Sequence, residues 1–80
     1  MTFDFPVYRK YRNNSSYFKI VNAEKFEEIK LLPGGFNLFI FEAKILPDRN
    51  YIQDMLYDYQ LHWKEIEESE YEIVKSKISN

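Results

Sequence analysis

The chain has 80 residues, of which 45% are hydrophobic and 30% charged, so it supports one hydrophobic core and one folded domain. The absence of cysteine excludes disulfides and thiolate metal sites, and no stretch reaches the roughly 20 apolar residues of a membrane span. The net charge of −2 is uneven, because residues 1–22 carry four cations against one acid and residues 48–80 carry four against eight. We therefore expect a cytoplasmic, polarised domain with no membrane contact.

A β-hairpin is predicted at the amino terminus. Residues 7–12 alternate in character, and the turn-forming sequence NNSS separates them from a second extended segment, YFKIV. In this second strand Phe18 and Ile20 share the face that we expect to meet the core. Tyr17 and Lys19 then lie on the opposite face.

The next segment, NAEKFEEIKLL, is compatible with two structures. A helix capped by Asn22 is one of them. Read with period two, the segment instead places Ile29 and Leu31 on the core face, and the PGG that follows forms the turn of a second hairpin. We favour a helical turn or loop at 23–26 followed by a strand over about 27–32.

The segment FNLFIFEAKIL, residues 36–46, is predicted to be the second strand of that hairpin, and its first half is apolar on both faces. Phe39 and Phe41 lie on the face that we assign to the core, and Leu38 and Ile40 lie on the other. A strand that is apolar on both sides is normally covered on both. We therefore expect Leu38 and Ile40 to meet a helix, a flap or a second copy of the chain.

Two helices are predicted in the carboxy-terminal half. Pro47 disfavours a helix at the preceding residue and Asp48 is a good cap, so the first helix should begin near residue 49. Its apolar stripe is Ile52, Met55, Leu56, Tyr59 and Trp63.

The last helix is predicted to start between residues 67 and 70, where Ser69 and Glu72 match a capping box, and its stripe is Tyr71, Val74 and Ile78. Residues 63–66 form either a connector or a short edge strand. The expected fold is a single α+β domain, with an antiparallel sheet of about four strands in two hairpins and two helices packed on one face.

The segments FEAKILPDRNYIQDML and WKEIEESEYEIV resemble a group of small, uncharacterised bacterial one-domain proteins. In that group a Trp, an Ile three residues later and an acidic stretch lead into the last helix. The likeness covers about the second half of the chain. This chain departs from the pattern at Glu67, where a Ser often follows the Ile. The resemblance implies no activity.

Catalytic and metal sites have little support in the sequence. Asp54, Asp58 and His62 are spaced by four and would form a row on a helix that could bind a divalent metal, but we favour a solvated polar face with an Asp58–His62 contact, because no second helix offers a matching set of ligands. His62 is the only histidine, and the sequence lacks a nucleophile elbow and a glycine-rich phosphate loop. We therefore predict a noncatalytic protein without a cofactor.

The most favoured function is protein interaction, with self-association as a homodimer or binding to another protein through the apolar sheet face at Phe36, Leu38 and Ile40. The alternative is binding of single-stranded nucleic acid, because cations alternate with aromatic rings in the first hairpin. The residues assigned to that alternative are Tyr8, Arg9, Lys10, Tyr11, Arg12, Tyr17 and Lys19.

Overall fold

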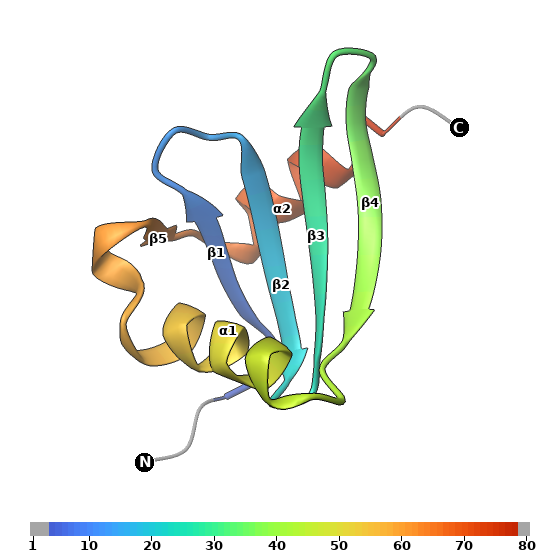
Figure 1. Cartoon of the computed structure of the whole chain (residues 1–80). Helices are drawn as coiled ribbons and strands as arrows, with labels where there is room; N and C mark the ends of the chain where they lie inside the picture. The colour runs from blue at the N-terminus through green and yellow to red at the C-terminus, as the bar shows by residue number, and fades with distance from the viewer. Residues whose placement is uncertain (1–3, 79–80) are drawn as a thin grey trace.

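The structure is a computed structural model that describes residues 4–78. Its central element is a five-stranded antiparallel sheet with the strand order β4-β3-β2-β1-β5, and helices lie on both sides of it (Figure 1). The elements are β1 (Val7–Tyr11), β2 (Ser16–Asn22), β3 (Lys25–Leu32), β4 (Gly35–Glu42), α1 (Leu46–Tyr57), the 3₁₀ turn η1 (Tyr59–Leu61), β5 (Trp63–Glu65) and α2 (Glu68–Lys75).

Strands β1 to β4 form a meander, and both predicted hairpins are confirmed. The ambiguous segment is a strand that begins at Lys25, directly after a tight turn. Asn22 supports this turn and caps no helix, because its side-chain oxygen accepts a hydrogen bond from the Glu24 amide at 2.8 Å. Pairing of Ile20 with Phe26 and of Ile29 with Leu38 fixes which apolar side chains share a face.

Helix α1 differs from its prediction at both ends. It begins at Leu46 and not near residue 49, because Pro47 lies in the first turn, where its missing N–H costs nothing. Asp48 is a first-turn residue and not the cap. At the other end the helix stops at Tyr57, and the last residue of the predicted stripe, Trp63, belongs to β5. Of the two alternatives for residues 63–66, the short edge strand is therefore correct.

Helix α2 starts at Glu68, within the predicted window. The predicted capping box is wrong, since the residue preceding the helix is Glu67, and no side chain caps it. Its stripe is confirmed, because Tyr71 and Val74 are buried and Ile78 packs beside them.

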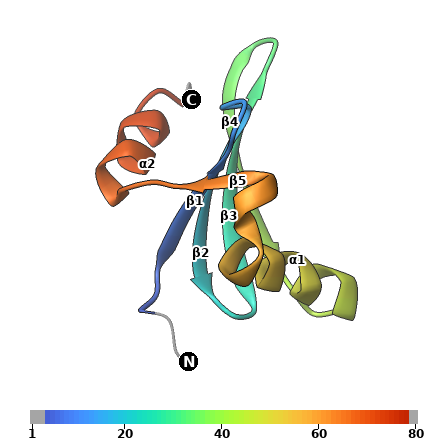
Figure 2. The same ribbon diagram turned by 90° about the vertical axis from the view of Figure 1, so that its left-hand side faces the viewer.

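The α+β class and the antiparallel sheet are confirmed, with β5 as an added fifth strand. The two helices do not share a face, however. Figure 2 shows the sheet nearly edge-on, with α1 on one side and α2 on the other, and β5 crossing between them at the β1 edge. The reason is that both faces of the sheet carry apolar residues, Phe18, Ile20 and Phe26 on one and Tyr17 and Ile29 on the other, and each face requires its own cover.

Each face has a separate hydrophobic cluster. The α1-side cluster consists of buried residues from the strands, α1 and the segment that joins them: Phe18, Ile20, Phe26, Ala43, Ile52, Met55, Leu56 and Trp63. The α2-side cluster is smaller and consists of Tyr17, Ile29, Tyr71 and Val74, with Tyr8, Phe36, Leu38, Ile66 and Ile78 packed around it. Phe18 and Ile20 thus lie on the opposite face from Tyr17, as the alternation predicted.

Candidate functional site

Strand β4 is an outer strand of the sheet, and its free side pairs with no strand in residues 4–78. It is eight residues long and carries only one charged residue, Glu42. Long apolar edge strands present unpaired backbone groups that readily pair with another chain. This edge is therefore the first candidate site.

The structure divides the three predicted interface residues. Phe36 and Leu38 are half-buried because they pack against the α2-side cluster, so the predicted helix cover is present there. Ile40 lies beyond that cover and is 59% exposed. Only this last residue presents most of its side chain to a partner.

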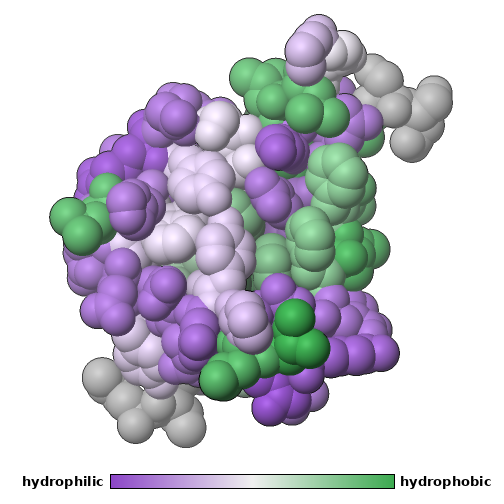
Figure 3. Space-filling view, in the orientation of Figure 1, coloured by the Kyte–Doolittle hydropathy of each residue, from purple (hydrophilic) through white to green (hydrophobic). Residues whose placement is uncertain are grey.

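The opposite face of β4 is more open than the sequence predicted. Phe39 and Phe41 were assigned to the core, yet they are 41% and 40% exposed, because α1 does not extend over β4. Phe41 stacks on Phe26, with ring centroids 4.9 Å apart, so only one of its faces is covered. Figure 3 shows the hydrophobic surface along this edge. We call Phe39, Ile40 and Phe41 the β4 patch.

The residues assigned to nucleic-acid binding are split between the two faces. Arg9 and Tyr11 point to the α1 side, whereas Tyr8, Lys10, Tyr17 and Lys19 point to the α2 side. Two of them on the α2 side are already engaged: Tyr17 is buried, and the Lys10 ammonium forms an ion pair with Glu70 at 2.8 Å. Tyr8 and Lys19 are half-buried. The first hairpin therefore presents no single row of open cations and rings.

Arg9 is the least accessible of these cations, with 6% of its surface exposed. Its Nε donates to the Met55 carbonyl at 2.9 Å, and Nη1 donates to the Tyr8 carbonyl at 2.9 Å. The guanidinium lies 4.1 Å from the centre of the Tyr59 ring. Burial lowers the pKa of Arg9, and the neighbouring Glu65 opposes this effect. Arg9 thus satisfies a carbonyl at the end of α1, which is a structural role.

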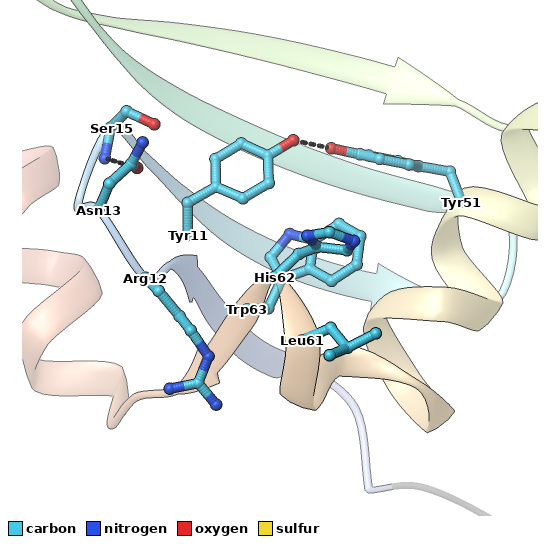
Figure 4. Close-up of a pocket in the computed structure, with 8 residues that line it drawn as sticks. All are labelled: Tyr11, Arg12, Asn13, Ser15, Tyr51, Leu61, His62 and Trp63. Atoms are coloured by element: carbon cyan, nitrogen blue, oxygen red, sulfur yellow. Dashed lines mark hydrogen bonds between the residues drawn. The ribbon is translucent and has the colours of Figure 1, made fainter.

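A second candidate site is an open pocket on the α1 side of the sheet, with a volume of about 550 Å³. We call it the Tyr11 pocket. Figure 4 shows the residues that line it: Tyr11, Arg12, Asn13, Ser15, Tyr51, Leu61, His62 and Trp63. They come from the end of β1, the first hairpin turn, α1 and the segment that leads into β5.

Aromatic rings form the floor of the Tyr11 pocket. Tyr11 and Trp63 are cross-strand neighbours and stack with centroids 5.7 Å apart, and Tyr51 meets the Trp63 ring edge-on. The Tyr11 and Tyr51 hydroxyls share a hydrogen bond of 2.6 Å. Burial and this hydrogen bond raise the pKa of Tyr51, so its phenol stays protonated well above neutral pH.

Only part of this pocket is visible in the sequence. Tyr11 and Arg12 were assigned to nucleic-acid binding, whereas Tyr51, His62 and Trp63 were read with the first predicted helix, and residues 63–66 were left as either a connector or a short edge strand. No local signal brings Trp63 to Tyr11, since their contact depends on the pairing of β5 with β1. The run of polar residues after Tyr11 correctly indicated a turn, but not the pocket wall that this turn provides.

Metal-binding clusters and membrane-spanning helices are both absent from residues 4–78. Residues 4–78 contain no cluster of three or more His, Cys, Asp and Glu side chains suited to a metal ion. The row of Asp54, Asp58 and His62 is not a helical face, because α1 ends at Tyr57. Within the same residues, neither helix has the length and apolar character needed to cross a membrane.

Comparisons with protein-family models, with curated proteins and with solved structures gave no match.

Proposed function

We propose that the protein is a noncatalytic interaction module that self-associates as a homodimer through strand β4. The observation that carries this proposal is an unpaired edge strand whose central residues, Phe39, Ile40 and Phe41, leave apolar surface open on both faces of the sheet. A partner strand covers both faces at once, whereas a helix covers only one.

Antiparallel pairing of two β4 strands supplies the missing cover. A two-fold axis perpendicular to the sheet keeps each face continuous, so residues of the same face become cross-strand neighbours. With Ile40 opposite the same residue of the second copy, Phe39 lies opposite Phe41 in both halves of the interface. This register covers all of the β4 patch and gives a continuous sheet of twice the width.

The sequence around the β4 patch supports the same arrangement. Leu38 and Glu42 flank the patch, and Glu42 already has a cation nearby, since Lys44 lies 3.3 Å from its carboxylate. Self-pairing therefore brings no unpaired like charges to the centre of the interface. The Lys or Pro residues with which many proteins protect their sheet edges are absent from β4.

The test is Ile40→Lys, with Ile73→Lys as the matched control. Both isoleucines are exposed to nearly the same extent, 59% and 58%, but the second belongs to α2 and is not part of the β4 edge strand. Analytical ultracentrifugation of the wild type should show a dimer. Ile40→Lys should shift it to monomer with an unchanged circular dichroism spectrum, and Ile73→Lys should leave the dimer intact.

A strictly monomeric wild type at high concentration would refute the proposal, as would equal dissociation by both substitutions. Loss of the fold in Ile40→Lys would show that Ile40 contributes to the stability of the monomer. The register has its own test, because the chain contains no cysteine. Ile40→Cys should form an intermolecular disulfide on mild oxidation, since directly opposed strand residues have suitable Cα separations, whereas Ile73→Cys should not.

Binding of single-stranded nucleic acid is the alternative, and fewer residues now favour it. Arg12 is exposed and Tyr11 lines an open pocket, but Arg9, Lys10 and Tyr17 are engaged within the fold. A labelled-oligonucleotide titration tests it, and salt-sensitive binding that survives Ile40→Lys would favour this alternative over the dimer.

A further inference from the structure

The Tyr11 pocket has hydrogen-bond donors and no carboxylate. None of its lining residues is an Asp or Glu, although the chain as a whole is acidic. Arg12 is the cation of the pocket, and it forms no ion pair among residues 4–78. A pocket of this kind favours a ligand with negatively charged oxygens.

Arg12 is held in place without using its whole guanidinium. Its Nε donates to the Gln60 carbonyl at 2.8 Å, and its backbone amide donates to the His62 carbonyl at 3.1 Å. These two contacts fix the side chain beside the pocket. The two terminal nitrogens are left to bind a ligand, and a planar guanidinium can bind two oxygens of one anion.

The tyrosine pair offers a further donor. Each phenol has one proton, and one hydroxyl donates to the other across 2.6 Å. The accepting hydroxyl therefore keeps a proton that has no acceptor within residues 4–78. Burial raises the pKa of Tyr51, so its phenol keeps its proton at neutral pH whether it donates or accepts in this pair.

Trp63 adds an independent observation. Its ring is almost completely buried and lines the pocket, yet its indole Nε1 has no hydrogen-bond partner among the described residues. A buried donor without a partner is uncommon in folded proteins and costs stability. The donor itself is enclosed, so a ligand in the open pocket does not contact it, but it places a spectroscopic reporter directly beneath the aromatic floor.

We propose that the Tyr11 pocket binds a small planar aromatic anion. Its ring packs on the aromatic floor formed by Tyr11, Tyr51 and Trp63, and its anionic oxygens bind Arg12. Stacking on the aromatic floor favours a ligand with a flat ring, and the hydrogen-bond donors favour a ligand with negative charge. A nucleotide and an aromatic carboxylate both have this chemistry. The site lies on the β1–β5 side of the sheet, away from β4, so it is independent of the proposed dimer.

The experiment uses the full chain labelled with ¹⁵N. Because the protein contains one tryptophan, its indole N–H gives a single cross-peak in a heteronuclear correlation spectrum, and this residue lines the pocket. The probes are adenosine monophosphate with its uncharged counterpart adenosine, and naphthoate with its uncharged counterpart naphthamide. Inorganic phosphate tests the anion without a ring.

The proposal predicts a saturable shift of the indole cross-peak with at least one of the two anionic probes. The neutral counterpart should bind about tenfold more weakly, and phosphate alone should not saturate. A response to adenosine monophosphate alone identifies a nucleotide site, and a response to naphthoate alone identifies a carboxylate site. Either response supports the proposal.

Arg12→Gln and Arg49→Gln form the matched pair of variants. Both arginines donate Nε to a backbone carbonyl, but Arg49 binds the Ala43 carbonyl and lies outside the pocket. Arg12→Gln should weaken binding about tenfold, whereas Arg49→Gln should not change it. Tyr51→Phe, which removes one proton from the hydroxyl pair, should also weaken it.

Three results would overturn the proposal. One is that neither anion moves the indole cross-peak in a saturable way. Another is that the neutral counterparts bind as tightly as the anions. The third is that Arg12→Gln, folded as judged by its spectrum, binds as well as the wild type.

Discussion

On the α1 side of the sheet, a helix and a short strand enclose a cluster in which aromatic rings meet mostly edge-on, and an open pocket remains beside Tyr11. On the α2 side, a helix of eight residues covers a smaller cluster, and polar contacts surround the buried tyrosine of that helix, Tyr71. The Tyr71 hydroxyl donates to Glu27 at 2.9 Å, and Lys10 and Glu70 form an ion pair between β1 and α2.

This difference shows that a short helix needs specific tertiary contacts to be stable. A helix of eight residues is far below the roughly 12–15 residues at which isolated helices become even marginal in water. Helix α2 is therefore stabilised by what it touches. The hydrogen bond from Tyr71 and the ion pair from Lys75, both to Glu27, fix the position of α2, while the larger α1-side cluster depends on the shapes of its rings.

The largest expected effect comes from removing a ring on the α1 side. Phe18 is fully buried and contacts the rings of Tyr11, Phe26, Tyr51 and Trp63. Phe18→Ala should lower the free energy of unfolding by about 3–5 kcal/mol. That is a large share of the roughly 4–12 kcal/mol expected for a domain of this size, and urea denaturation measures it.

Phe36→Ala deletes the same side chain on the α2 side and is the control. Phe36 is half-buried beside Tyr17, so its removal should cost less than half as much as Phe18→Ala. Equal costs for the two variants would show that both clusters stabilise the fold to the same extent, and the contrast between the faces would be wrong.

Alkaline pH should act on both faces at once. Burial raises the pKa of Tyr51 on the α1 side and of Tyr71 on the α2 side, and hydrogen bonds add to both shifts. The unfolded chain loses these protons near pH 10, before the folded protein does, so stability is unaffected below that pH and falls as the pH rises further. The loss reaches at most about 1.4 kcal/mol per pH unit for each tyrosine.

Tyrosinate absorbance and denaturation measured over the same pH range test this prediction. Two tyrosines should ionise only when the fold is lost. A double variant, Tyr51→Phe with Tyr71→Phe, should lose stability less steeply above pH 10 than the wild type. Ionisation of all seven tyrosines before unfolding would contradict the shifts.

The smallest expected effect is the difference in stability between removing the Tyr71 hydroxyl and removing the Tyr51 hydroxyl. Tyr71→Phe removes a donor from the Glu27 carboxylate, whose side chain is only 15% exposed, and should cost about 1–2 kcal/mol. Tyr51→Phe removes a hydroxyl whose partner, Tyr11, lines an open pocket that water can enter, so it should cost about 0.5 kcal/mol or less. Thermal unfolding of both variants measures the difference, and a larger cost for Tyr51→Phe would contradict it.

The meander could be predicted because its signals are local. Alternation placed Phe18 and Ile20 opposite Tyr17, and the turn residues fixed the two hairpins between strands that follow one another along the chain. The doubly apolar character of β4 was also visible. The sequence did not show which residues of β4 are covered by a helix. How far each helix extends over the sheet depends on tertiary packing.

The end of α1 shows why the helix boundary and the Tyr11 pocket could not be predicted from the sequence. The spacing of Tyr59 and Trp63 continues the helical stripe, so the sequence indicated a longer helix. In the structure, Arg9 binds the Met55 carbonyl and Arg12 binds the Gln60 carbonyl, and these donors from the β1 region satisfy the segment where the helix stops. A pattern within one segment contains no information about donors that arrive from another. The Tyr11 pocket depends on the same contacts.

The position of β5 also sets an order of events during synthesis. Strands β1 to β4 contact their neighbours along the chain, so they can assemble as soon as they leave the ribosome. The partner of Tyr11, Trp63, is translated much later, and until then the outer side of β1 remains unpaired. A nascent chain that stalls before Trp63 therefore presents two open sheet edges, at β4 and at β1, whereas the finished chain has β1 paired and only β4 of these two still open.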